Sequence, residues 1–350
     1  MRNRENTLRA ARFETPERIP MVFHINAACW HHYPQEALQD LMAAHPLLFP
    51  GFVPKPDGVQ PKFGAGSKAG EPYTDPWGCV WETADDGIAG TVTHHPLADW
   101  SAFESFAAPS PGAVIGHHPA DWSKTAESLR RVKEDGGLPK GSLAHGHTFL
   151  LLADLRGYQN LIFDMADEDP RFLRLLRTVE DVNMAAVRRF VELGVEWMEY
   201  PEDLGMQVGP MLSPEHFVKY IKPSYQRLMA PAREAGCVIH MHSDGDIRTL
   251  VDDLVDGGVD VVNLQDLVNG IDWIKDRLAG RVCIDLDVDR QRITRFGTPR
   301  EIDALIREEV EKLGSRRGGL MMIHGLYPGT PLANVKALMD AMEKYATYYS

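Results

Sequence analysis

From about residue 140 onward, short apolar runs rich in Val, Ile, Leu and Met alternate with amphipathic segments that carry helix start and stop signals. This alternation predicts strands that are each followed by a helix. Strands are expected at 142–151, 195–200, 237–242, 259–264, 281–287 and 319–324, and nearer the N-terminus at 19–25 and 52–63. Eight parallel strands with intervening helices favour a (β/α)8 TIM barrel, and a doubly wound sheet is the rival architecture.

Helix boundaries are marked most clearly after residue 169. Asp169 precedes Pro170 at a first helical position, and Gly194 ends the same helix. Thr298 opens another helix and has Glu301 three residues further on, which is a capping box. The buried stripe of the first of these helices is expected to be Phe172, Leu175, Leu176, Val179, Val182, Ala186 and Phe190.

The pattern changes between Pro72 and Pro111, where aromatic residues are interspersed with Gly, Pro and Asp. This composition predicts an irregular or hairpin insertion, at about residues 64–125, on the loop face of the barrel. Because no internal repeat or Gly/Ser linker separates the insertion from the rest, residues 1–350 are expected to form one elaborated barrel domain.

Charge and composition limit the classes of partner. The 50 acidic and 37 basic residues leave a formal charge of −13, which repels nucleic-acid backbones and anionic membrane surfaces. The expected partner is therefore a small molecule or a protein. The 4 cysteines show no Cys-x-x-Cys spacing, and no signal peptide or long apolar span is evident, so a cytoplasmic protein with free thiols is expected. The oligomeric state stays open, a homodimer being one arrangement that the sequence allows.

Polar residues gather where the predicted strands end, which is where a barrel builds its active site. The period of two places His240, His242 and Asp244 on one face of their strand, with His240 deeper and structural. The other polar residues expected at strand ends are His24, His145, His147, Glu199, Glu202, Asp203, Asn263, Gln265, Asp266, Asp285, Asp287 and His324.

Such a set suits either a divalent metal bound by nitrogen and oxygen or acid/base chemistry without a metal, and spacing alone does not decide between them. His242, Asp244 and His324 are the leading catalytic and metal-binding candidates, with hydrogen-bonded core residues as the alternative interpretation of each. The histidine pairs 31–32, 94–95 and 117–118 lie in predicted loops, where solvent exposure is expected.

Four segments together resemble the uroporphyrinogen decarboxylase superfamily: residues 202–215, 242–247, 258–263 and 324–334. Within that superfamily are the decarboxylase and many cobalamin-linked methyltransferases, all built on barrels. The decarboxylase has an arginine-rich motif after its first strand, whereas this chain has His24-Ile-Asn-Ala-Ala-Cys-Trp-His-His-Tyr33 there. Without arginine, that place offers no bidentate partner for a multiply anionic porphyrinogen.

The methyltransferases that this chain resembles bind zinc through a His-x-Cys pair and a later Cys. The resemblance places His242, Asp244 and His324 at these positions, so both thiolates are replaced. The harder ligand set disfavours thiol substrates and fits the branch that demethylates phenyl methyl ethers, which residues 73–78 and 287–291 also resemble. Because carboxylates serve as ligands in that branch, the resemblance adds Glu199 and Glu202 to the candidate zinc ligands.

The resemblance therefore implies a zinc-dependent methyltransferase that moves a methyl group from a methoxylated substrate, a phenyl methyl ether, to Co(I) of a separate corrinoid protein. The residues expected to bind the substrate are His24, Trp30, Trp77, His147, Asn263, Asp285 and Tyr327. Two alternatives stay open: a metal-free decarboxylase acting on another carboxylated substrate, and a non-catalytic barrel that binds a small molecule.

Overall fold

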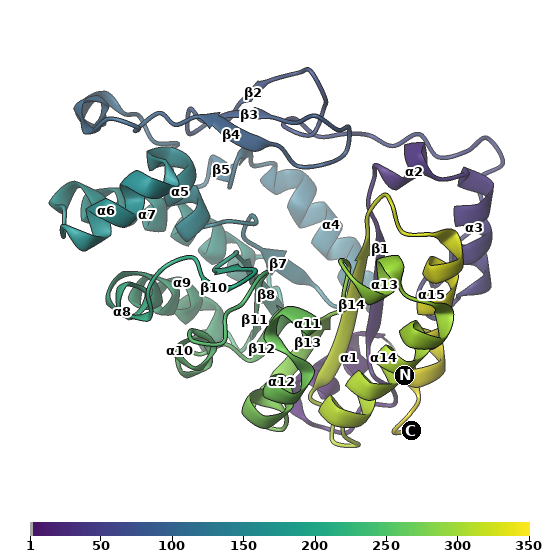
Figure 1. Ribbon diagram of the computed structural model, residues 1–350. Helices are drawn as coiled ribbons and strands as arrows, with labels where there is room; N and C mark the ends of the chain where they lie inside the picture. Colours follow the sequence, from purple (N-terminus) through teal and green to yellow (C-terminus); the bar gives the residue numbers. More distant parts are fainter. Residues whose placement is uncertain (1–2) are drawn as a thin grey trace.

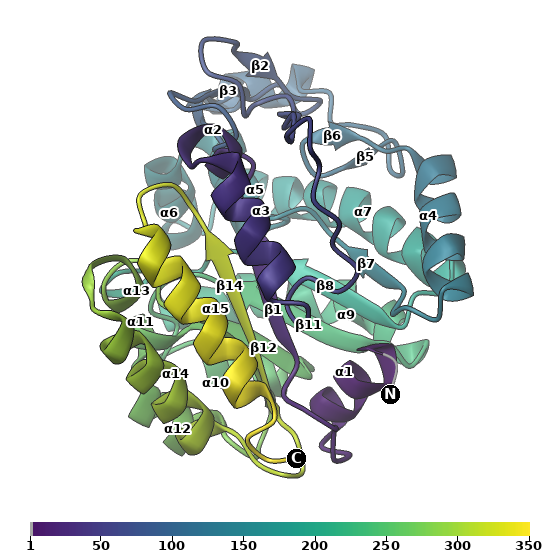
Figure 2. The same ribbon diagram turned by 90° about the vertical axis from the view of Figure 1, so that its right-hand side faces the viewer.

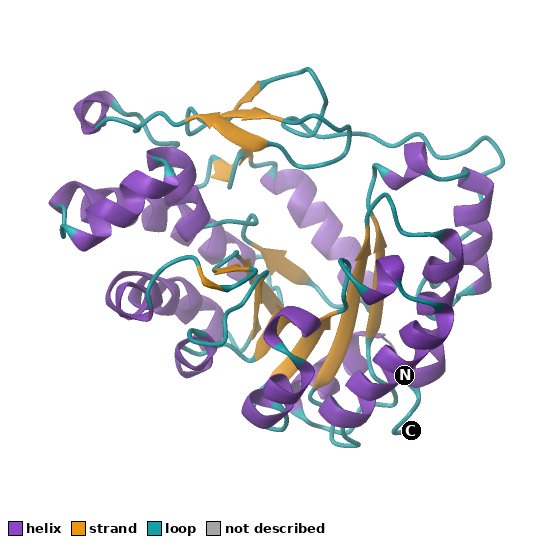
Figure 3. Ribbon diagram, in the orientation of Figure 1, coloured by secondary structure: helices purple, strands orange, loops and turns teal. Residues whose placement is uncertain are grey.

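A parallel sheet forms the centre of the computed structural model, which describes residues 3–350 (Figure 1). Within these residues, seven strands are hydrogen-bonded in the order β1-β14-β13-β12-β11-β8-β7, and every neighbouring pair is parallel. Their bounds are β1 Met21–Ile25, β7 Lys140–Ser142, β8 Trp197–Pro201, β11 Val238–Ser243, β12 Val261–Gln265, β13 Cys283–Asp287 and β14 Leu320–Leu326. This strand order and the helices packed around the sheet confirm the predicted TIM-barrel fold class (Figure 3).

Helices cover the outside of the barrel, and several begin at the predicted signals. Asp169 accepts a hydrogen bond from the backbone of Arg171 at the start of α7, and Thr298 and Glu301 form the capping box of α14. The longer helices are α3 Gln35–Ala44, α4 Trp122–Glu134, α5 Phe149–Arg156, α6 Tyr158–Ala166, α7 Pro170–Glu192, α9 Lys222–Glu234, α12 Ile271–Leu278, α14 Pro299–Leu313 and α15 Leu332–Ala346. The shorter ones are α2 Cys29–His32, α8 Pro214–His216, η2 Phe217–Ile221, α10 Val251–Asp256, α11 Asp266–Asn269 and α13 Ile293–Phe296.

Helix α1, Asn3–Arg12, closes the bottom of the barrel (Figure 2). Its Leu8 and Ala11 pack in one buried cluster with inward-facing residues from the beginnings of the strands, including Trp197 and Met321. The opposite end of the barrel, where the strands end, therefore remains the mouth. No helix within residues 3–350 combines the length and apolar character needed to cross a membrane.

The prediction of an eighth strand at 52–63 is wrong. This segment runs beside α3, and two glutamine side chains of α3 take its backbone hydrogen bonds: Gln39 bonds the N–H and C=O of Lys55, and Gln35 those of Val59. Prolines along the segment lack the N–H groups that a ladder needs. The barrel consequently has an open seam between β1 and β7.

The predicted strand 142–151 is correct only at its beginning. Strand β7 ends at Ser142, and the apolar run that begins at Phe149 forms helix α5. A short buried apolar run fits either a strand or a helix by its periodicity, and here a carboxylate at the N-terminus of the run favours the helix. Residues 143–148 form a loop at the mouth.

The predicted insertion lies across the mouth of the barrel, at the top of Figure 1. It contains an antiparallel sheet and a small hairpin, joined by a 3-10 helical segment. The bounds are β2 Tyr73–Thr74, β3 Val80–Glu82, β4 Thr91–His94, η1 Trp100–Ser105, β5 Val114–Ile115 and β6 His118–Pro119. A second hairpin, β9 Gly205–Met206 with β10 Gly209–Pro210, follows β8.

Candidate active site at the barrel mouth

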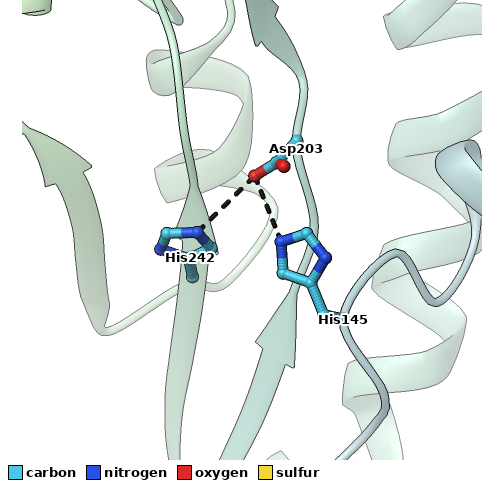
Figure 4. A group of neighbouring side chains, drawn as sticks. All are labelled: His145, Asp203 and His242. Atoms are coloured by element: carbon cyan, nitrogen blue, oxygen red, sulfur yellow. Dashed lines mark ion pairs between the residues drawn. The ribbon is translucent and has the colours of Figure 1, made fainter. Parts of the chain in front are cut away.

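Three side chains meet at the mouth: His145, Asp203 and His242 (Figure 4). The Nε2 atom of His145 lies 3.3 Å from Oδ1 of Asp203, and Nε2 of His242 lies 3.5 Å from the same oxygen. One donor atom of each residue lies within 4.8 Å of the others. We call these three residues the mouth cluster. His145 is exposed and the other two are half-buried, so the cluster is open to an incoming molecule on one side.

The alternation of side chains along the strands explains why Asp203 belongs to the mouth cluster. On β8, Trp197 and Glu199 face the barrel interior, and continuing by twos beyond the strand end reaches Asp203. On β11 the same period carries His242 and Asp244 to the inner face. The backbone N–H of Asp244 donates to Asp203 at 3.0 Å, which ties the two strand ends together.

Asn263 holds the ring of His242 in one orientation. The amide of Asn263 donates to the carbonyl oxygen of Asp285, so its own oxygen accepts a hydrogen bond from Nδ1 of His242. This assignment leaves the proton of a neutral His242 on Nδ1 and a lone pair on Nε2, which faces the cluster. An orienting partner of this kind is a usual companion of a metal-binding histidine.

The carboxylates of the site change the protonation of its histidines. Burial alone would lower the pKa of His242, but the hydrogen bond to Asp203 and the charges of Asp244 and Asp203 outweigh it and raise this pKa to about 9. For His145, Asp203 likewise outweighs burial and raises the pKa. Burial opposes ionisation of Asp203, yet its two histidine partners hold its pKa well below the usual range. The cluster is therefore a place where positive charge is favoured.

Arg290 lies beside the mouth cluster and holds two carboxylates. Its Nη2 atom is 2.6 Å from Asp287 and 3.2 Å from Asp244. Asp244 in turn lies 3.7 Å from Nε2 of His242. Burial raises the pKa of Asp287 to about 7, and the charge of Arg290 opposes that rise. Asp244 thus lies between Arg290 on one side and His242 of the mouth cluster on the other.

The donor set of the mouth cluster fits a divalent metal such as Zn²⁺. Two imidazole nitrogens and one carboxylate oxygen make up a frequent three-ligand combination of catalytic zinc sites, in which the remaining position is open to water or substrate. The orientation of His242 by Asn263 and the excess of negative charge both agree with a cation at this place.

Glu199 and Glu202, predicted as further ligands, lie outside the mouth cluster. Glu199 faces the barrel interior and pairs with Lys140 at 3.0 Å. Glu202 is fully buried and points the other way, because it is one residue out of phase with Asp203. Its carboxylate accepts hydrogen bonds from three backbone N–H groups at the start of α5 and from Tyr225. These contacts make Glu202 a helix cap.

His324 and His147, predicted at the mouth, are buried away from it. His324 lies on the outer face of β14, packs against the ring of Phe23 and donates from Nδ1 to the carbonyl of Val288 at 3.3 Å. It shares that face with Met322, whereas Met321 faces inward. His147 lies behind the mouth, where its Nδ1 atom is hydrogen-bonded to the hydroxyl oxygen of Thr148 at 2.7 Å. Burial lowers the pKa of His324 to about 4 and that of His147 to about 3, so both stay neutral.

The residues predicted to bind substrate do not gather in one place. Asn263 supports His242, as described above. His24 and Asp285 face the barrel interior below the mouth, where Asp285 pairs with His240 at 2.9 Å. Beside them, a cavity of about 530 Å³ opens through the seam between β1 and β7.

The aromatic residues predicted to bind substrate, Trp30, Trp77 and Tyr327, divide into accessible and buried ones. Tyr327 is 44% exposed above Arg290 and lines a cavity of about 430 Å³ together with residues of α2 and the insertion. Trp30 is half-buried on α2. Trp77 is fully buried inside the insertion, where its indole N–H donates to Gly116. An aromatic substrate at the mouth would therefore meet Tyr327 or Trp30 rather than Trp77.

His145, Asp203 and Arg290 are the residues of the site that the sequence pattern did not single out. His145 and Asp203 stand among the polar residues expected at strand ends. The alternation of side chains along β8 is the signal that places Asp203, and not Glu202, on the inner face. His145 carries no such signal, because it lies in the loop after β7 rather than on the strand. Arg290 lies three residues beyond the end of β13, and only its contacts in the folded protein identify it as part of the site.

Comparisons with known proteins agree with this barrel. The sequence profile of the family described as "Uroporphyrinogen decarboxylase (URO-D)" matches residues 81–345. A uroporphyrinogen decarboxylase of Thermus thermophilus is 24% identical over 268 residues, covering 73% of this chain and 72% of that protein. The human uroporphyrinogen decarboxylase is 25% identical over 181 residues, covering 49% of this chain and 47% of that protein. For several such relatives, the match spans about half of their length.

A solved structure gives the same result at the level of the fold. The structure described as "methyltransferase from Methanosarcina mazei" superposes with a TM-score of 0.65 and covers 99% of both chains, at 17% sequence identity. At this identity the likeness concerns the fold alone.

Proposed function

The chain belongs to the uroporphyrinogen decarboxylase (URO-D) family, and we propose that it is a zinc-dependent methyltransferase. In this proposal a methyl group passes from a methoxylated substrate, a phenyl methyl ether, to Co(I) of a separate corrinoid protein. The observation that carries the proposal is the mouth cluster, because it offers two imidazole nitrogens and one carboxylate with no thiolate.

In this function His145, Asp203 and His242 would hold the metal ion. A zinc ion bound there supplies Lewis acidity, which stabilises the negative charge on the oxygen that loses the methyl group. Asn263 keeps Nε2 of His242 turned toward the cluster. Arg290 draws Asp244 to one side, so that one face stays open for the ether oxygen. His324, Glu199 and Glu202 are not part of this proposed ligand set.

The shape of the mouth supports a small donor and a separate acceptor. The exposed side of His145 faces solvent, from which a corrinoid protein would approach. Tyr327 and Trp30 provide aromatic surface near the mouth for a substrate ring. The nucleophile belongs to the partner, and this chain contributes orientation and activation of the leaving group.

The decisive experiment measures zinc and methyl transfer in the same preparations. We expect about one zinc per chain, and transfer of methyl from a methoxyphenol to cob(I)alamin by the purified protein. His242→Ala and Asp203→Asn should lose both zinc and at least about 100-fold in rate, because the metal would lose a ligand. His94→Gln, an exposed histidine of the insertion, is the matched control and should behave as wild type. A metal-free protein with full activity would refute the proposal.

A metal-free decarboxylase is the second candidate, because the curated relatives that match are decarboxylases. Against it stands Arg290, which is held by Asp244 and Asp287 instead of facing a substrate carboxylate. Release of carbon dioxide without corrinoid or zinc would favour this candidate. Tight binding of a small molecule without any turnover would instead favour the non-catalytic barrel.

A further inference from the structure

The insertion carries a second histidine that is oriented by a buried carboxylate. Asp75 is buried, and its Oδ1 accepts hydrogen bonds from the backbone N–H groups of Trp77 and Cys79. Its Oδ2 accepts from the indole N–H of Trp81 at 2.8 Å and lies 3.0 Å from Nδ1 of His117. Because this carboxylate only accepts, Nδ1 of His117 is the donor. Within residues 3–350, no hydrogen bond occupies Nε2 of His117, and its side chain is 16% exposed.

This pair lies one residue along the chain from a contact between the insertion and the loop that carries His145. Gly116 adopts a φ of +59°, and a Cβ built on it would lie 2.1 Å from Cβ of Ala144, so the two backbones are in close contact. His117 follows Gly116, and His145 of the mouth cluster follows Ala144. The indole of Trp77 also fastens Gly116 through its carbonyl at 3.0 Å. The insertion thus brings an oriented imidazole to the neighbourhood of His145.

Asp154 on α5 is influenced by the charges of both His117 and His145. The insertion rests on its turn of the helix, since the carbonyl of Asp154 accepts hydrogen bonds from His95 and from the thiol of Cys79. No hydrogen bond reaches the side-chain carboxyl within residues 3–350. Burial raises the pKa of Asp154 to about 7. The ionisable groups that act on it are His117, Asp75, Glu202 and His145.

We propose that His117, oriented by Asp75, is the acid that gives a proton to the oxygen from which the methyl group departs. The inference rests on the proposed function. The O–CH₃ bond breaks with its electron pair on oxygen, the methyl group goes to Co(I) of the corrinoid protein, and oxygen takes the proton of Nε2. His117 is then a catalytic residue, whereas Asp75 is a positioning residue.

The first test compares donors whose leaving groups differ in their need for a proton. With 4-methoxyphenol, we expect His117→Gln to slow methyl transfer to cob(I)alamin by about 100-fold, a usual contribution of a general acid. With 4-nitroanisole, whose phenolate is stable without a proton, the loss should stay below about threefold. His118→Gln is the matched control, because the neighbouring histidine stacks on Tyr73 and has no hydrogen bond with Asp75. Equal losses on both donors, or none, would overturn the proposal.

A binding measurement keeps the inference testable if no ether is demethylated. The phenol and phenolate forms of 4-nitrophenol absorb at different wavelengths, so its ionisation can be followed on the protein. We expect His117→Gln to lower the acid dissociation constant of bound 4-nitrophenol about tenfold, because the phenolate loses the hydrogen bond from the imidazole. Absence of methyl transfer together with this shift would reject the proposed function alone. Identical titrations in wild type and variant, or no binding, would reject the role of His117.

Discussion

His324 shows how one residue can stand at a strand end and still lie outside the mouth. Its imidazole fills a place between β14 and the surrounding helices, with Phe23 on one side and the carbonyl of Val288 as its acceptor. Burial lowers its pKa to about 4, from 6.5 in a solvated chain. Protonation in this place would leave a cation without a carboxylate partner, so folding and protonation of His324 oppose each other.

This opposition predicts an acid-sensitive part of the folding stability. Above pH 6.5 His324 is neutral in both states and has no effect. As the pH falls from 6.5 toward 4, only the unfolded chain takes up the proton, and the free energy of unfolding should fall by about 3 kcal/mol in total. His324→Asn keeps a donor for Val288 and removes the titration. Urea unfolding at several pH values should show a shallower acid decline in the variant, while its zinc content stays that of wild type. Parallel declines would contradict this account.

At the scale of one element, α5 depends on a residue that is distant in sequence. The N–H groups of Thr148, Phe149 and Leu150 have no intrahelical partner, and all three donate to Glu202. The carboxylate also faces the positive end of the helix dipole. Because only the loop 143–148 separates β7 from α5, this cap shapes the loop that carries His145.

We expect Glu202→Ala to destabilise the protein by about 3 kcal/mol, since three buried N–H groups lose their acceptor. Glu202→Gln should cost less, because the amide oxygen can still accept. Tyr225→Phe, which removes one donor to the same carboxylate, is the matched control and should cost about 1 kcal/mol. Urea unfolding would measure all three. A Glu202→Ala variant as stable as Tyr225→Phe would show that water replaces the cap.

At the scale of the whole molecule, the open seam distinguishes this barrel from a closed one. Strand β1 is hydrogen-bonded only to β14, and β7 only to β8, within the described residues 3–350. The interior beside the seam is polar, with Lys140 paired to Glu199 and His240 paired to Asp285. A closed barrel usually fills this space with branched apolar side chains. One member of each pair, Lys140 and Asp285, lines the cavity at the seam.

The seam predicts an uneven pattern of amide hydrogen exchange. Amides of β12, which has a strand on both sides, should exchange slowest, and those of β1 and β7 should exchange faster through local opening. In segment 52–63 we expect protection at Lys55 and Val59, whose N–H groups are held by α3. Gln35→Ala should remove the protection of Val59 alone. Equal protection of β1, β7 and β12 would mean that the seam closes in solution.

The sequence by itself determined the barrel class, most strand positions, the capped starts of α7 and α14, and the insertion across the mouth. These features depend on local periodicity and on capping residues, which act within a few positions of the chain. The sequence also placed His242 and Asp244 at a strand end together. The family was recognisable from motifs that occur in the expected order.

Only the tertiary structure decided which strand-end residues meet. Asp203 faces the mouth, whereas Glu202, one position earlier, lies beneath α5. By the same alternation, His324 lies on the outer face of β14 and points away from the mouth. His145 reaches the cluster through a loop whose path depends on the cap supplied by Glu202. Segment 52–63 was predicted to hold the eighth strand despite its prolines, but its backbone hydrogen bonds go to α3. These outcomes depend on contacts between residues far apart in the chain, which local patterns do not encode.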